Sequence, residues 1–116
     1  MREQNWSHSE KQIARKAFER ALDAEKQAAI REMKERVARI RGVDDIDELW
    51  ALEDWLRRRR KGIDEKFDYR YSVLSSVLAR LLFDGAIAET DLAGLAQEKV
   101  DDILRIVKIY RRSAER

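Results

Sequence analysis

Residues 7–42 read SHSEKQIARKAFERALDAEKQAAIREMKERVARIRG. Ser7 followed by Glu10 has the spacing of a capping box, in which each side chain bonds the backbone of the other at the start of a helix. Beyond this pair, apolar side chains recur at steps of three and four residues, and no proline interrupts them. The stretch therefore predicts one long amphipathic helix that ends at Gly42, because glycine readily adopts the left-handed conformation that closes a helix.

Three further helices are predicted. Asp44 or Asp45 caps the second, and the link is so short that the first two helices should form an antiparallel hairpin. Asp68 begins the third helix, which runs to Gly85, and Thr90 caps the fourth. The apolar stripe of the second helix, which marks its expected buried side, consists of Leu49, Leu52, Leu56, Ile63 and Phe67.

These elements give an all-α fold, a long antiparallel helix hairpin plus a small helical head. A chain of 116 residues is the size of one ordinary domain, so we expect residues 1–116 to form a single domain. The hairpin spans residues 7–66, and the helical head spans residues 67–116.

The length of the first helix bears on oligomeric state. About 32 helical residues extend about 48 Å, whereas a compact chain of this size has a radius of gyration of about 13 Å and a diameter of about 35 Å. The hairpin must therefore project beyond the head, and its apolar stripe would face water unless a second copy covered it. We expect a homodimer through the long helices.

The composition argues against several classes of function. The 25 basic and 23 acidic residues leave a net charge of +2, so no strong overall field attracts nucleic acid. The absence of cysteine fits a reducing cytosol. No apolar run approaches the ~20 residues of a membrane span, and no signal peptide is recognisable. We expect a cytoplasmic, unprocessed protein with no membrane insertion.

Motifs for chemistry are also missing. His8 has no second histidine at metal-ligand spacing, and the pairs Asp44–Asp45 and Asp101–Asp102 are typical of caps and solvated helix faces. No glycine-rich phosphate loop is present. We predict a non-enzymatic protein with no metal, no cofactor and no small-molecule substrate.

Residues 46–60 read IDELWALEDWLRRRR and hold the candidate partner-binding residues. Trp50 lies on the flank of the apolar stripe with Asp54 one turn later, and Glu53 can pair with an arginine one turn on. Arg60 falls near the stripe and beside Glu53, so we expect it to be the arginine that is held in place. An indole bordered by opposite charges has the composition of an interface hot spot. The alternative, that Trp50 packs under a neighbouring helix while the charges form a solvated face, stays open.

Two neighbouring stretches have structural interpretations. The basic run at residues 57–61 would suit phosphates, but consecutive helical residues point all round a helix and DEKFD adds three acids directly afterwards. Nucleic-acid binding is therefore not expected. FDYRYS, residues 67–72, interleaves aromatic rings with an arginine, and we interpret it as the joint between hairpin and head.

One family resemblance is specific. DELWALEDWLRRRRKGIDEKFDYRYSVL, followed by ARLLFDG and DLAGLAQEK, resembles the fluorescence recovery protein family, and WSHSE extends the similarity to the first helix. The resemblance implies an all-helical dimer that binds the photoactivated orange carotenoid protein and speeds its return to the inactive orange form. That action ends photoprotective, non-photochemical quenching at the phycobilisome. It also implies a functional patch of Trp50, Asp54 and Arg60.

The chain departs from the family pattern at two places. Glu53 stands where the cyanobacterial members usually have histidine, and Ser75 and Ser76 stand where they usually have large apolar or aromatic residues. These departures resemble divergent members from bacteria that lack the carotenoid protein. The alternative function is therefore a dimeric helical adaptor for an unrelated protein partner.

Overall fold

The computed structural model describes residues 5–115, and all of the regular structure in this range is helical. The all-α prediction is confirmed. Four α-helices and two short 3₁₀ turns follow one another as α1 His8–Val37, η1 Val43–Asp45, α2 Ile46–Lys66, α3 Leu74–Phe83, η2 Glu89–Leu92 and α4 Gln97–Ala114.

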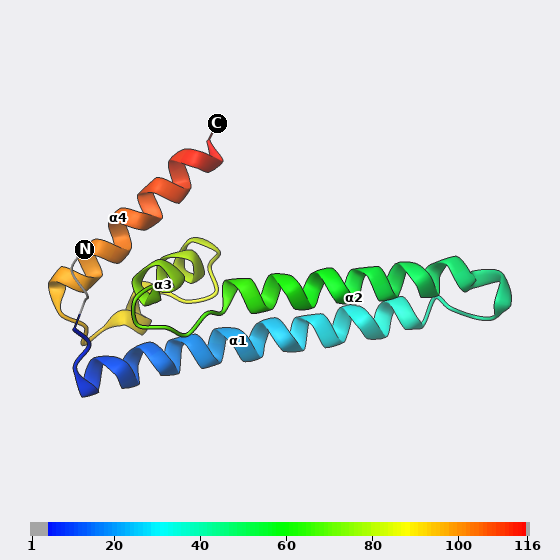
Figure 1. Cartoon of the computed structure of the whole chain (residues 1–116), viewed down its shortest axis with the longest axis horizontal. Coiled ribbons are helices and arrows are strands. Elements are labelled where there is room, and N and C mark those ends of the chain that lie inside the picture. Colours follow the sequence, from blue (N-terminus) through cyan, green and yellow to red (C-terminus); the bar gives the residue numbers. More distant parts are fainter. Residues whose placement is uncertain (1–4, 116) are drawn as a thin grey trace.

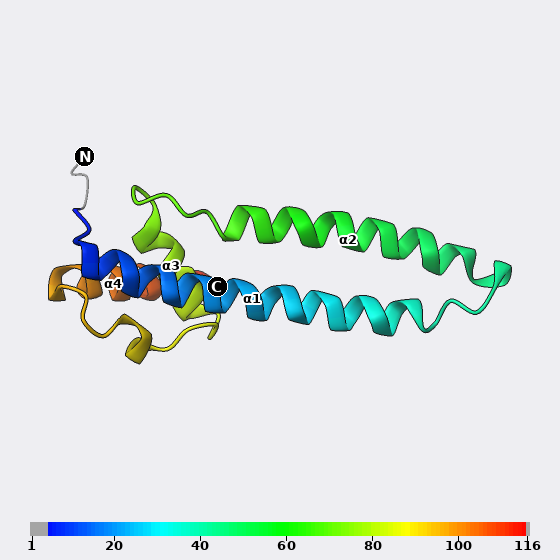
Figure 2. The ribbon, with the colours of Figure 1, turned by 90° about the horizontal axis from the view of Figure 1, so that it is seen from below.

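The helices α1 and α2 lie antiparallel and side by side, and α3 and α4 gather at the end of the hairpin that holds the N-terminus (Figures 1 and 2). The described chain measures 57 × 35 × 25 Å, and its radius of gyration is 17.8 Å. A compact chain of this length would have a radius of gyration of about 13 Å. The far half of the hairpin therefore projects from the head, as the helix length predicted.

The start of α1 is built as the sequence predicts. The Ser7 hydroxyl accepts a hydrogen bond from the Glu10 amide at 3.2 Å, and the Ser7 amide donates to the Glu10 carboxylate at 3.0 Å. Both halves of the capping box are thus present. They satisfy two of the amides that a helix N-terminus otherwise leaves without partners.

The predicted end of this helix is wrong. The helix stops at Val37, and Gly42 is extended rather than left-handed, with φ of 176°. Tighter bonds from the amides of Arg39 and Ile40 to carbonyls three residues earlier end the helix before the glycine. Asp45 occupies the N-cap position of α2 without capping it, because its carboxylate accepts the Arg41 amide at 2.8 Å and so holds the turn.

The buried side of α2 also differs from the predicted stripe. Of the stripe residues only Leu52 is buried, while Leu49 and Leu56 are 39% and 40% exposed. The side that faces α1 instead includes Leu52, Trp55 and Arg59. The Arg36 guanidinium of α1 lies over the Trp55 ring, and Arg59 pairs with Glu25 of α1. The helix is therefore rotated relative to the prediction, and part of its apolar stripe lies outside the hairpin contact.

The two helices of the head, α3 and α4, begin at other residues than predicted. Asp68 pairs with Arg70 instead of capping α3, whose N-cap is Val73. Thr90 lies in η2, and α4 begins only at Gln97. The end of α3 agrees with the sequence, since Gly85 has φ of 77° and the Ala86 amide bonds the Leu81 carbonyl at 2.9 Å, as in a Schellman motif.

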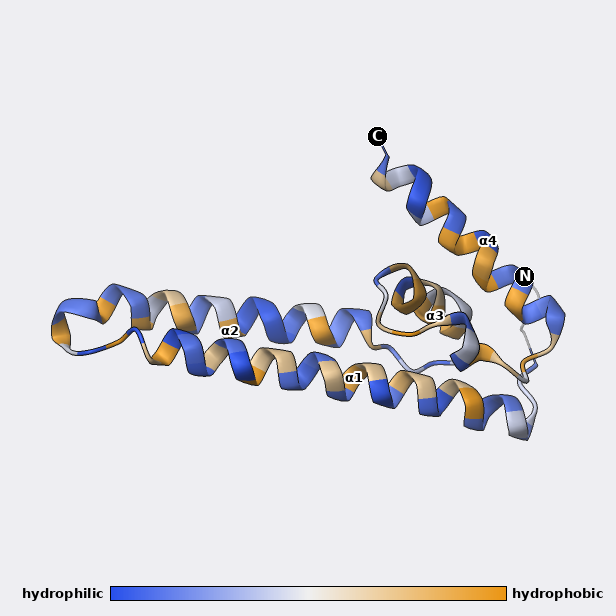
Figure 3. Ribbon diagram, turned by 180° about the vertical axis from the view of Figure 1, so that it is seen from behind, coloured by the Kyte–Doolittle hydropathy of each residue, from blue (hydrophilic) through white to orange (hydrophobic). Residues whose placement is uncertain are grey.

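The core is shared between the head and the first half of α1. It contains Ala14, Ala17 and Phe18 of α1 together with apolar residues of α3, η2 and α4. Figure 3 shows hydrophobic residues concentrated on α3 and α4 and scattered along the far half of the hairpin. The largest fully buried side chains are Leu74, Leu78, Leu81, Leu92, Ile103 and Val107.

The division into residues 7–66 and 67–116 within one domain stays a prediction. None of the helices in the described range has the length and hydrophobicity needed to cross a membrane.

The stretch at residues 67–72 forms the predicted joint. Phe18 of α1 meets Phe67 and Tyr69 edge to face, with ring centres 5.4 and 4.9 Å apart. Tyr69 in turn meets Tyr71 at 5.6 Å, and the Arg15 guanidinium lies 4.4 Å from the Tyr69 ring centre. Such ring contacts stabilise the fold beyond the contribution of the apolar area that they bury. The chain segment that leaves α2 is therefore fixed against α1.

The Glu10 carboxylate makes hydrogen bonds at the starts of two helices, α1 and α4. Besides closing the capping box of α1, it accepts the Ala96 amide at 2.9 Å, at the N-cap of α4, and the Lys99 ammonium at 2.8 Å. The Ala96 amide, the Lys99 ammonium and the Ser7 amide together lower the pKa of Glu10 from 4.5 to about 2. One buried carboxylate thus ties the N-terminus of α1 to that of α4.

This depressed pKa predicts an acid-dependent stability. Because the pKa is lower in the folded chain, the stabilisation is complete above about pH 4.5 and is lost as the pH falls toward 2. Glu10→Gln should remove about 3 kcal/mol of that dependence, at about 1.36 kcal/mol per unit of pKa. Urea unfolding at a series of pH values measures it. Equal slopes between pH 4.5 and 2 for the parent and the variant would contradict the assignment.

Candidate partner-binding surface

Trp50 lies on the side of α2 that faces away from α1. At about 100° per residue it is turned about 160° from Leu52, which is buried between the two helices. Its side chain is accordingly 55% exposed. A large indole left this open on a rigid helix is available for contact with another molecule.

The two acids beside Trp50, Glu53 and Asp54, differ in whether they form an ion pair. Glu53 accepts a hydrogen bond from Arg57 at 2.5 Å, one turn on, and both side chains are exposed. Asp54 is exposed, and no hydrogen bond or ion pair to its carboxylate is found within residues 5–115. Asp54 therefore presents an uncompensated negative charge next to the indole.

The expectation for Arg60 is wrong. Its side chain is 87% exposed, and its only ion pair within the described range is a long one of 3.9 Å to Asp64. The arginine that is held is Arg59, which pairs with Glu25 of α1 at 3.2 Å. The physical reason is the rotation of α2, which turns Arg59 toward α1 and Arg60 toward solvent.

An apolar strip with basic edges runs along one side of the hairpin. Leu56 and Ile63 of α2 lie near Ala29 of α1, and together they line an open groove of about 320 Å³. Further along the hairpin Ile30, Val37, Ile46 and Leu49 are also at least 39% exposed. The sequence stripe indicated the α2 residues of this strip, but it placed them against α1. The complete groove lining is Lys26, Ala29, Leu56, Arg59, Arg60, Ile63 and Asp64.

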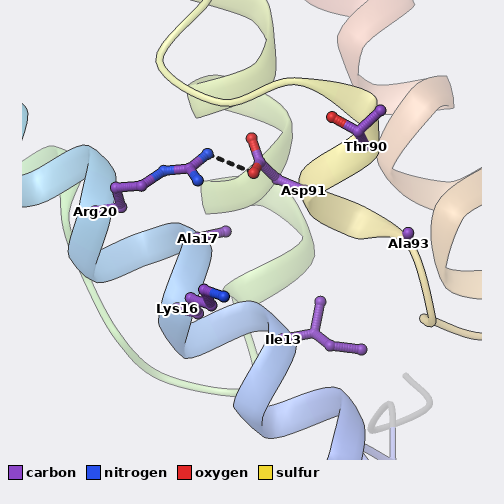
Figure 4. A pocket seen from close by; sticks show the side chains of 7 residues that line it. All are labelled: Ile13, Lys16, Ala17, Arg20, Thr90, Asp91 and Ala93. Carbon is purple, nitrogen blue, oxygen red and sulfur yellow. Dashed lines mark hydrogen bonds and ion pairs between the residues drawn. The ribbon is translucent and has the colours of Figure 1, made fainter.

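A second hollow lies between α1 and η2, where Arg20 reaches across to the Asp91 carboxylate (Figure 4). Its volume is about 230 Å³, and its lining is Ile13, Lys16, Ala17, Arg20, Thr90, Asp91 and Ala93. The contact between Arg20 and Asp91 spans the opening and fastens η2 to α1. Among residues 5–115, no three histidine or acidic side chains are grouped so that they could hold a metal ion.

Comparisons with known proteins identify the family to which the chain belongs. Residues 6–107 match the family described as photoprotection regulator fluorescence recovery protein. The fluorescence recovery protein of Synechocystis sp. PCC 6803 is 33% identical over 104 residues, which cover 90% of this chain and 93% of that protein. The chain belongs to the fluorescence recovery protein family. It is therefore a member of a family of photoprotection regulators.

Solved structures of the family have the same fold. The fluorescence recovery protein of Fremyella diplosiphon is 33% identical with a TM-score of 0.81, and the match covers 90% of this chain and 99% of that one. The Synechocystis sp. PCC 6803 structure gives the same identity, coverage and TM-score. Since the family regulates photoprotection, a protein partner follows from the membership.

The two neighbouring arginines provide a matched test of the helix rotation. Arg59→Met should lower the free energy of unfolding by about 1–2 kcal/mol, because it leaves Glu25 without its guanidinium partner. Arg60→Met should change it by less than about 0.5 kcal/mol, since that side chain is exposed. Urea denaturation followed by circular dichroism measures both. A larger loss for Arg60→Met would show that α2 is turned the other way.

Proposed function

We propose that this protein is a non-enzymatic, dimeric cytoplasmic regulator that binds a photoactivated orange carotenoid protein, or an analogue, and accelerates its return to the inactive form. The observation that carries the proposal is the outward indole of Trp50 beside Asp54, in a chain of the fluorescence recovery protein family. Trp50, Glu53, Asp54 and Arg60 are the proposed partner-binding residues.

The mechanism involves no bond chemistry. A partner with two conformations changes faster when a bound protein stabilises the transition arrangement more than the starting one. Trp50 would supply the apolar anchor, because its exposed indole loses water on contact. Asp54 and Arg60 would orient the partner, since both charges are exposed and weakly engaged in the chain itself. Arg60 also lines the groove of the apolar strip, so it would act from the rim of the dimer contact.

The apolar strip of the hairpin supports the dimer. Leu49 and Leu56 of α2 and Ile30 and Val37 of α1 expose at least 39% of their surface, although they lie on an ordered helical pair. A contiguous exposed apolar surface of this kind is typical of a protein contact. A second copy placed antiparallel would cover both strips at once, because two-fold symmetry sets the same patch against itself.

Glu53 supports the alternative function. Its carboxylate is exposed and paired with Arg57 at the edge of the proposed surface, so it adds negative charge beside Asp54. Ser76 is likewise exposed and small on α3. A partner suited to this charge would differ from one suited to the histidine of the cyanobacterial pattern. The alternative is a dimeric adaptor for an unrelated protein in an organism without the carotenoid protein.

Colour recovery separates the two functions. Photoactivated orange carotenoid protein, mixed with this protein in the dark, should return to its orange form several-fold faster than alone. Trp50→Ala and Arg60→Ala should remove most of this acceleration while leaving the helical circular dichroism unchanged, because both side chains point outward. Arg105→Ala, an exposed cation on α4, is the matched control and should retain it.

Recovery at the unassisted rate, together with no detectable complex, would favour the adaptor. Loss of helicity in the Trp50 variant would show instead that the indole is structural. Unchanged acceleration by both variants would place the contact elsewhere on the surface.

The dimer has its own test. Leu56→Glu should give a monomer by light scattering at micromolar concentration, because it places a charge in the middle of the apolar strip. Ile109→Glu is the control, since Ile109 is 56% exposed but lies on α4, away from the hairpin. Equal masses for both variants would contradict an interface on this strip.

A further inference from the structure

The two residues before the α1 cap lie against the start of α4. Trp6 is 7% exposed and belongs to the core cluster that also contains Leu95 and Ile103. Lys99, in the first turn of α4, is 8% exposed. Its ammonium donates to the Asn5 carbonyl and lies 5.0 Å from the centre of the Trp6 ring. A single buried cation therefore holds both residues of this segment.

The bonds that hold this segment are separate from the bonds that cap α1. The capping box joins Ser7 to Glu10 and contains neither Asn5 nor Trp6. Ser7 has extended backbone angles, with φ of −67° and ψ of 165°, so the chain changes direction there. Rotation about Ser7 would lift Asn5 and Trp6 while the first turn of α1 and its pair with Lys99 stay in place.

The position of Asn5 and Trp6 against the head, here called the closed position, carries two costs in free energy. The indole nitrogen of Trp6 is buried, and no hydrogen-bond partner for it is found within residues 5–115. A buried donor without a partner loses the bond that it makes to water. Lys99 is a buried cation, and the attraction of an ion pair often only offsets the loss of hydration. Burial of the Trp6 ring therefore has to outweigh both costs for the closed position to persist.

We propose that Asn5–Trp6 is a detachable strap, closed over the head by Lys99 and opened by rotation about Ser7. Opening would uncover the part of the head core that Trp6 covers and the first turn of α4, without unfolding the hairpin. The strap lies at the opposite end of α1 from the hairpin tip (Figure 1), so it operates independently of the Trp50 surface.

The strap is tested by removing the buried cation that holds it together with the carboxylate that pairs with this cation. Trp50→Phe and Trp55→Phe make Trp6 the single tryptophan of the chain, which has three. In that background, Glu10→Gln with Lys99→Met removes both buried charges together, so that neither is left uncompensated. Acrylamide quenching of Trp6 should rise several-fold, and the backbone amides of Lys99 and Val100 should exchange faster with deuterium. The amides of α2 and α3 should exchange as in the parent.

The control is Arg105→Met, which removes an exposed cation from the same helix and should leave Trp6 quenching unchanged. Quenching of the test variant as low as that of the parent would overturn the proposal, because apolar packing alone would then hold the segment.

A second measurement applies if the test variant fails to fold. In the unmodified protein, exchange at Lys99 and Val100 should be insensitive to low concentrations of urea, as expected for a local opening. Exchange there that follows the same urea dependence as the core of α3 would show that the strap opens only on global unfolding, and would also overturn the proposal.

Discussion

The hairpin is only two helices thick beyond the head, and this constraint governs the rest of the molecule. A helix with one neighbour buries one side, so α2 has a single buried apolar residue, Leu52. Leu49 and Leu56 remain exposed beside it, although their spacing is that of a buried stripe. The hairpin alone therefore leaves one apolar side without a packing partner. A second copy on the apolar strip would leave the flank of α2 that carries Trp50, about 100° round the helix from Leu49, open to a partner.

Charges and rings connect the hairpin to the head. Lys66, at the end of α2, lies between Glu25 of α1 at 3.8 Å and Asp84, just beyond α3, at 2.8 Å. Burial alone would raise the pKa of Asp84, but the bonds from Lys66 and Arg80 outweigh it, and the pKa is lowered. With the aromatic joint at Phe67 and Tyr69, these pairs fix the direction in which α2 leaves the head. The position of Trp50 relative to the head is thereby defined.

Local signals in the sequence predicted much of this fold. The capping box and the end of α3 at Gly85 depend on residues close together in the chain, and both were predicted. The stretch at residues 67–72 was predicted to be a joint, but its contact with Phe18 of α1 lies beyond any local pattern. The rotation of α2 was not predicted, because the period of apolar residues locates a stripe but not the neighbour that covers it. Arg59 is held by Glu25, which lies on another helix. The start of α4 was placed too early because Leu92 and Leu95 are buried in the connecting segment and imitate a helical period. The pair of Glu10 and Lys99 joins residues 89 apart, which no local pattern indicates.

We propose that a second copy covers the exposed strip of the hairpin while Trp50 stays open. Hydrogen exchange of the unmodified protein over a dilution series tests it most directly, read at the backbone amides of residues 46–58. We expect protection in this segment to fall on dilution, while protection of α3 stays constant and Trp50 remains accessible to quencher throughout. Protection that is independent of concentration, with a shielded Trp50, would contradict it.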